Sequence, residues 1–384
     1  MAAVIDDNGK IIKNPFELDT THVSFLADRR IYYSTYSEDK SKIMIYKIYK
    51  ENKVFNFTTI LFHDSFKLIH KSIIETPFKA EDNIFSDFFV DDSGNFIFAK
   101  GDHFGTTDYF YHLVLVTKLP EQDNLIINEV NLFGLLLDEI NLKIDNVNKQ
   151  YLINSLFYKK RNGNIEGLYT ALWNQNFNIF ILQYATLFSD SLESGTKSKE
   201  SPNLVFNNFA IRDVILKKNG GFILMAESLT SGHEHNDSWL RPYTNFRYSS
   251  FPYLFSSRNS YRIFESNFNS DIVILNFDDT LGLAWGNVIK KSQFNNWGDY
   301  SYLSYFMMNT GTAIHFLFDE QVRHKQITYD QVIKQDGKLS NKSLLRSLNL
   351  NYQLMPSFAA QVSSYEIIIP CRYRNYICFA KISY

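Results

Sequence analysis

The chain has 384 residues, of which 45% are hydrophobic and 16% are aromatic, so it can bury a sizeable core. Its 39 Lys and Arg residues nearly balance its 41 Asp and Glu residues, and this balance leaves no basic field that would attract nucleic acid. No window contains the roughly 20 consecutive apolar residues that a membrane helix needs, so we expect no membrane span.

The N-terminal residues, Met1 to Gly9, contain neither the basic region nor the hydrophobic region of a signal peptide. Two locations therefore stay open. The protein is cytoplasmic if Met1 is its native start. It is periplasmic, outer-membrane-associated or secreted if the chain is a mature form.

Pairs of strands joined by tight turns recur along the chain. One runs from Phe88 to Phe98 and another from Val214 to Leu224. Their turns use Gly, Asn and Asp, which tolerate the left-handed backbone of a hairpin. We expect inner hairpins with turns near Asp28–Arg29, Asp92–Gly94, Asn146–Asn148, Asn219–Gly221, Thr310–Gly311 and Ser363–Ser364.

Each inner hairpin is followed by an outer hairpin, as in the stretch from Ile43 to Phe57. A repeated unit of two hairpins is typical of a β-propeller blade. The sequence therefore predicts an all-β fold, a β-propeller of about six blades with seven as the alternative.

The two ends of the chain each provide an incomplete set of strands. The last segment, Tyr376 to Tyr384, is expected to be the third strand of a blade, and Gly9 to Pro15 a strand with no hairpin before it. Joined, they would complete one blade, close the ring and remove its exposed edges. We therefore expect residues 1–384 to form a single β-propeller domain.

One inserted stretch, from Leu229 to Ser270, interrupts the repeat and is rich in Ser, Asn, Arg and aromatic residues. A loop longer than about 15 residues without secondary structure is usually functional or disordered. Tyr, Trp and Arg dominate protein-interface hot spots, and flat aromatic rings also stack on sugars. The alternative is a lid that packs onto its own propeller. The candidate partner-binding residues are Trp239, Arg241, Tyr243, Arg247, Tyr248 and Tyr253.

Two other kinds of motif are explained better by local structure than by metal binding or catalysis. His233, Glu234 and His235 lie close together, but no further Cys or His cluster lies nearby, so we predict a polar loop and no metal site. The pairs Asp91–Asp92 and Asp278–Asp279 could serve as a glycosidase acid and base. Both fall in expected turns, where Asp is favoured by its local backbone bonds.

No nucleophile elbow, phosphate-binding loop or dinucleotide fingerprint is present in the sequence. We therefore predict no catalytic residue and no cofactor. The missing motifs lower the expectation of an enzyme without excluding one, since a propeller active site can be assembled from several blades.

Cys371 and Cys378 are the two cysteines, too few for a metal framework or a disulfide-rich scaffold. If Arg374 and Asn375 form a two-residue turn, the two sulfur atoms face each other across a hairpin. They are then either two small buried hydrophobic residues or a cross-strand disulfide.

The stretches from Arg212 to Glu227 and from Pro370 to Lys381 resemble propeller-like envelope proteins of bacteria that use type 9 secretion. The resemblance extends over most of the chain and includes no catalytic motif, so it implies no site residue. It implies export.

Two hypotheses for function follow. The first is a non-enzymatic binding or scaffold module of the bacterial cell envelope, such as a component of a secretion or envelope assembly. It would recognise a protein partner through one propeller face and the 229–270 loop. The alternative is a carbohydrate-binding or glycoside-processing propeller with a site built from several blades. Converging carboxylates with shifted pKa values would favour an enzyme.

Overall fold

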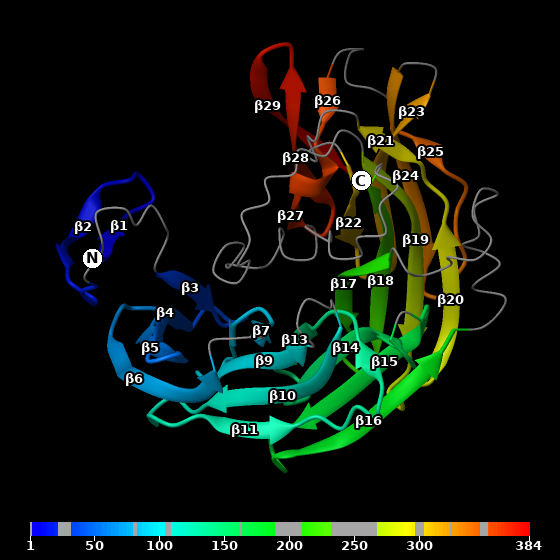
Figure 1. Cartoon of the computed structure of the whole chain (residues 1–384). Coiled ribbons are helices and arrows are strands. Elements are labelled where there is room, and N and C mark those ends of the chain that lie inside the picture. Colours follow the sequence, from blue (N-terminus) through cyan, green and yellow to red (C-terminus); the bar gives the residue numbers. More distant parts are fainter. Residues whose placement is uncertain are drawn as a thin grey trace. The chain divides into compact units, whose positions relative to one another are not determined.

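The computed structural model describes residues 2–21, 32–79, 83–103, 109–161, 163–188, 209–231, 267–295, 303–322, 325–345 and 352–384 (Figure 1). The elements in these ranges are antiparallel strands, together with the short 3₁₀ helix η2 (Pro356–Phe358). No helix among the described residues is long and apolar enough to cross a membrane.

The chain divides into two compact units. The first contains Met1–Lys100 and Val114–Glu129, and the second contains Gly101–Leu113 and Val130–Tyr384. The expectation of a single domain stays a prediction.

The first unit is built around the four-stranded antiparallel sheet β3-β4-β5-β6. Its aromatic core includes Phe57 and Phe98, whose rings stack with centroids 5.2 Å apart. The strands that lie wholly or partly in this unit are β1 (Ala2–Ile5), β2 (Ile11–Phe16), β3 (Tyr33–Tyr36), β4 (Lys42–Glu51), β5 (Val54–His63), β6 (Leu68–Lys79), β7 (Asn83–Phe85), β8 (Phe89–Val90), β9 (Phe96–His103), β10 (Phe110–Lys118) and β11 (Ile126–Glu129).

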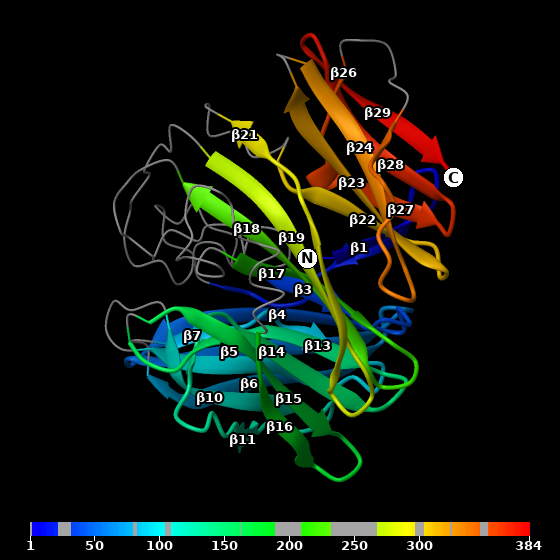
Figure 2. The same ribbon diagram turned by 90° about the vertical axis from the view of Figure 1, so that its right-hand side faces the viewer.

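The second unit contains successive antiparallel meanders, in which most strands pair with the next strand along the chain (Figure 2). Its further strands are β12 (Leu136–Leu137), β13 (Asn141–Asp145), β14 (Gln150–Tyr158), β15 (Ile165–Asn174), β16 (Ile179–Leu187), β17 (Phe209–Leu216), β18 (Phe222–Ser231), β19 (Asn267–Phe277), β20 (Leu283–Ile289), β21 (Gln293–Asn295), β22 (Tyr305–Asn309), β23 (Ala313–Val322), β24 (Lys325–Lys334), β25 (Ser343–Leu344), β26 (Tyr352–Leu354), β27 (Ala360–Ser363), β28 (Glu366–Tyr373) and β29 (Tyr376–Ser383).

Neighbouring sheets of the second unit pack face to face through apolar side chains. Leu168 on β15 and Phe222 on β18 share one buried cluster, and Ile274 on β19 and Phe316 on β23 share the next. A third cluster joins Phe306 on β22 to the sheet that contains β28. Burying each such side chain stabilises the fold by about 2 kcal/mol, so these clusters hold the successive sheets together.

These meanders confirm the predicted all-β, β-propeller class, but they do not confirm six blades. Five sheets of four or more strands are present among the described residues. The count differs because the short strand β12 pairs with both β10 and β14 and joins two of the expected hairpin pairs into one sheet.

Most of the expected turns lie where the sequence places them. The turns after Asp91, Asp145, Leu216, Asn309 and Ser363 join the paired strands β8–β9, β13–β14, β17–β18, β22–β23 and β27–β28. The turn predicted at Asp28–Arg29 falls outside the described residues.

The terminal strands differ from the expectation in one respect. The sequence predicts no hairpin before β2, but β1 precedes it and pairs with it as an antiparallel hairpin. β29 pairs with β28, which also pairs with β26 and β27. Closure of a ring by the two terminal strands stays a prediction.

Candidate functional site

The inserted stretch is shorter than the sequence suggested, and its two ends are held by a β-ladder. β18 and β19 pair as far as Ser231 and Asn267, so the interruption runs over residues 232–266 rather than 229–270. All six candidate partner-binding residues, Trp239, Arg241, Tyr243, Arg247, Tyr248 and Tyr253, lie within 232–266 and outside the described residues. The same holds for His233, Glu234 and His235.

A buried cluster of charged side chains is centred on Glu227 of β18, five residues before the first residue of this interruption. Glu227 is the central carboxylate, and its strand neighbours are Ala210 on β17 and Ile272 on β19. A β-bulge between Ile211 and Asp213 leaves Arg212 as an extra residue of β17. A bulge can re-aim a side chain in this way, and here the Arg212 side chain meets Glu227.

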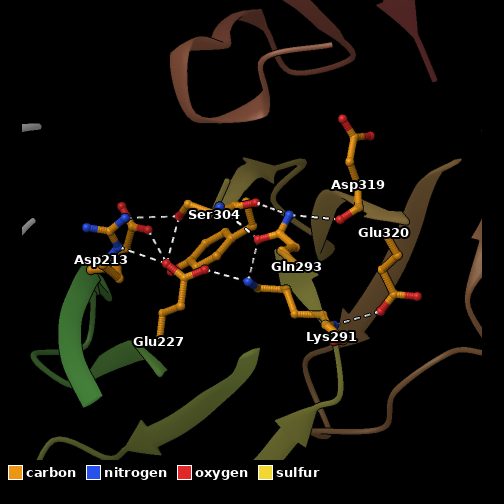
Figure 3. Close-up of polar contacts among 10 residues, drawn as sticks. Asp213, Glu227, Lys291, Gln293, Ser304, Asp319 and Glu320 are labelled. Atoms are coloured by element: carbon orange, nitrogen blue, oxygen red, sulfur yellow. Dashed lines mark hydrogen bonds and ion pairs between the residues drawn. The ribbon is translucent and has the colours of Figure 1, made fainter. Parts of the chain in front are cut away.

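Glu227 is completely buried and interacts through both carboxylate oxygens (Figure 3). Its Oε1 lies 2.6 Å from Nζ of Lys291, which is also completely buried. Its Oε2 accepts hydrogen bonds from Nε of Arg212 at 3.0 Å and from Oγ of Ser304 at 2.7 Å. The two cations and the hydroxyl thus surround a single carboxylate.

Gln293, on β21, completes the cluster on its other side. Its Oε1 accepts hydrogen bonds from Nζ of Lys291 at 2.7 Å and from the backbone N–H of Ser304 at 2.8 Å. Its Nε2 donates to the backbone carbonyls of Ser304 and Asp319, each at 2.9 Å. The side chain therefore links the sheet of β21 to the segment before β22 and to β23.

A second carboxylate balances the charge of the cluster. Oδ2 of Asp213 accepts a hydrogen bond from the Tyr305 hydroxyl at 2.9 Å. Arg212 and Lys291 provide two positive charges, and Glu227 and Asp213 provide two negative charges. A buried charge is tolerated only when it is paired and hydrogen-bonded, and this cluster meets both conditions.

The electrostatics keep Glu227 ionised. Burial alone would raise the pKa of this carboxyl group, but the charges of Lys291 and Arg212 outweigh burial and lower the pKa below its usual value. A general acid needs the opposite shift. Glu227 therefore acts as a fixed negative charge that ties strands together.

The two aspartate pairs that could have been an acid and a base are held in turns, as predicted. Oδ1 of Asp91 accepts hydrogen bonds from the backbone N–H groups of Ser93 and Asn95 at 3.0 and 2.8 Å. Oδ1 of Asp278 accepts from those of Thr280 and Gly282, each at 2.9 Å. Both carboxylates thus have a local structural role.

Sequence reasoning missed the buried cluster, although a signal was present. Arg212 and Glu227 are the first and last residues of one of the two stretches that carry the resemblance. Each is a charged residue among apolar strand residues. Lys291, Gln293 and Ser304 gave no such signal, since they lie in connecting segments or a short strand. Among the described residues, no group of three or more His, Cys, Asp or Glu side chains could hold a metal ion.

No protein-family model matches the sequence, and no curated protein matches it. Among solved structures, the chain is similar to the β-propeller domain of the Trilobed protease from Pyrococcus furiosus, with 8% identity over 92% of this chain and 83% of that one, and a TM-score of 0.40. It is also similar to an α-L-arabinofuranosidase from Fusarium graminearum, with 7% identity over 92% and 93% of the chains and a TM-score of 0.40.

An α-L-arabinanase from Penicillium chrysogenum is similar at 7% identity over 92% of this chain and 93% of that one, with a TM-score of 0.38. At these identities and scores, the similarities assign neither an activity nor a substrate to this chain.

Proposed function

We propose that the chain is a non-enzymatic binding module that presents residues 232–266 to a protein partner. The observation that carries this proposal is the buried charge cluster around Glu227, five residues before the start of that segment. The cluster bonds β18, the strand that leads into the segment, to Arg212 on β17 and to Lys291, and its central carboxylate is held in the ionised form.

A rigid base favours binding because less conformational freedom is lost when the partner docks. The segment itself contains Trp239, Arg241 and Tyr243 among its candidate residues, types that are enriched at the centres of protein interfaces. The proposed setting is the bacterial cell envelope, as a component of a secretion or envelope assembly. That setting rests on the resemblance of the chain to envelope proteins.

A deletion designed from the strand register tests the proposal. Ser231 and Asn267 are directly paired, so an Asn-Gly turn can replace residues 232–266 and join the two strands. We expect this variant to fold with a thermal midpoint within a few degrees of that of the intact chain, because the described strands are retained. Affinity purification of both proteins from native cells, with quantitative mass spectrometry, should then show the partner enriched at least tenfold only with the intact chain.

A second variant keeps the segment and replaces Trp239, Tyr243 and Tyr248 with Ala. It should lose the same partner. An unchanged list of enriched proteins for both folded variants would contradict the proposal. Specific hydrolysis of a glycan by the intact chain would contradict the non-enzymatic assignment and favour the carbohydrate alternative.

A further inference from the structure

The two cysteines lie directly opposite each other on neighbouring strands. Cys371 on β28 is the register partner of Cys378 on β29. Directly paired residues of antiparallel strands have Cα atoms about 4.5–5.5 Å apart, and a disulfide accepts about 4.4–6.8 Å. The backbone register therefore meets the first requirement for a cross-strand bond.

The two side chains also lie on the same face of the sheet. Cys371 is buried in the cluster that contains Ile369 and Ala380, and Cys378 packs against that cluster while part of it stays accessible. The thiol of Cys378 donates a hydrogen bond to the backbone carbonyl of Cys371 at 3.2 Å. Both thiols are reduced in this structure.

We propose that Cys371 and Cys378 form an oxidisable pair, a site of reversible disulfide formation that fastens β29 to β28. This inference rests on the strand register and does not depend on the proposed partner. The sequence left two alternatives open, a pair of buried hydrophobic residues or a disulfide. The proposed pair combines them, because the two thiols pack against the core when reduced and lie where oxidation can join them.

The reaction with a small disulfide such as oxidised glutathione proceeds in two exchanges. The accessible Cys378 thiolate first attacks the reagent, forms a mixed disulfide and releases one glutathione thiolate. The thiolate of Cys371 then attacks Sγ of Cys378 and displaces the second glutathione. Two protein S–H bonds and one reagent S–S bond are lost, while one protein S–S bond and two molecules of reduced glutathione are formed.

The second exchange is expected to be slow at neutral pH. Burial, together with the hydrogen bond to Cys378, raises the pKa of the Cys371 thiol to about 12. Because the thiolate is the nucleophile, the rate of ring closure should rise about tenfold for each unit of pH below that value.

The test uses the full reduced chain, treated with oxidised glutathione at pH 7 and pH 8.5. We expect a monomer whose intact mass is lower by two hydrogens, a peptide map with Cys371 linked to Cys378, and loss of both iodoacetamide-reactive thiols. Dithiothreitol should restore both thiols. Amide exchange in β29 should be slower in the oxidised form.

Cys378→Ser is the matched control, because it keeps the shape of the partly exposed side chain and cannot form the bond. In this variant the mass loss and the slower exchange of β29 should both disappear. The proposal is overturned if the intact chain stops at the glutathione adduct at pH 8.5, if it forms only intermolecular dimers, or if both thiols remain reactive.

Discussion

Asp19 is the residue on which several side chains of the first unit converge. It lies between β2 and β3, and its carboxylate oxygens are 2.6 Å from Nζ of Lys47 and 2.7 Å from Nζ of Lys71. The Tyr32 hydroxyl donates a third hydrogen bond at 2.6 Å. Burial alone would raise the pKa of Asp19, but the bonds from Lys47, Lys71 and Tyr32 outweigh burial and hold the pKa well below its usual range.

We predict that Asp19→Asn lowers the free energy of unfolding by about 1–2 kcal/mol at pH 7. A lowered folded-state pKa contributes stability that is present above the unfolded value of about 4 and is lost as the pH falls. The difference between the two proteins should therefore be constant from pH 7 to about pH 5 and shrink below about pH 4. Urea unfolding across this range measures it, and a difference that grows towards acid pH would contradict the assignment.

Local residue roles could be predicted from the sequence, whereas distant ones could not. Asp91 and Asp278 bond to backbone groups two and four residues further along, so their turn chemistry is visible in a short window. Asp19 bonds to lysines 28 and 52 residues away. Nothing in a local pattern indicates which distant cation a carboxylate will meet.

At the scale of elements, the cluster around Glu227 connects strands of two neighbouring sheets. Glu227 on β18 bonds to Ser304 next to β22, and Gln293 on β21 bonds to the backbone of Asp319 on β23. Removing one partner from a buried ion cluster leaves the other charges unpaired. The cluster should therefore matter more to stability than any exposed ion pair.

We predict that Glu227→Gln lowers the free energy of unfolding by about 3–5 kcal/mol, since the buried charges of Lys291 and Arg212 lose their counter-charge. Glu366→Gln is the matched control. Glu366 pairs with Lys381 at 2.6 Å, but both side chains are substantially exposed, so its loss should cost no more than about 1 kcal/mol. Chemical denaturation of both variants gives the comparison, and equal losses would contradict the role of the cluster.

The sequence predicts the strands better than it predicts the contacts between their side chains. Apolar runs and Asn/Gly turns indicated β17, β18 and the hairpin between them. The bulge at Arg212 is a tertiary feature, because one extra residue changes the direction of the side chain without changing the composition of the strand. The sequence also did not predict that β12 joins two groups of strands into one sheet, because a strand of two residues is too short to show a hydrophobic period.

At the scale of the whole molecule, the chain is near-neutral, its described strands form antiparallel meanders, and residues 232–266 are inserted between the paired strands β18 and β19. The apolar clusters between sheets and the buried ion cluster account for the scaffold of the second unit. In many proteins, binding residues lie on loops that a rigid scaffold positions. We therefore propose that residues 232–266, which the strands of this scaffold hold at both ends, carry the binding function.

Site-specific photo-crosslinking of the full chain in its native cells tests that proposal most directly. A photoreactive phenylalanine analogue would replace Trp239 in one variant and Phe177, which is 71% exposed in the turn between β15 and β16, in the matched control. The account predicts a light-dependent adduct with one protein partner from position 239 and none from position 177. The same adduct from both positions, or none from position 239 while the protein is folded, would contradict it.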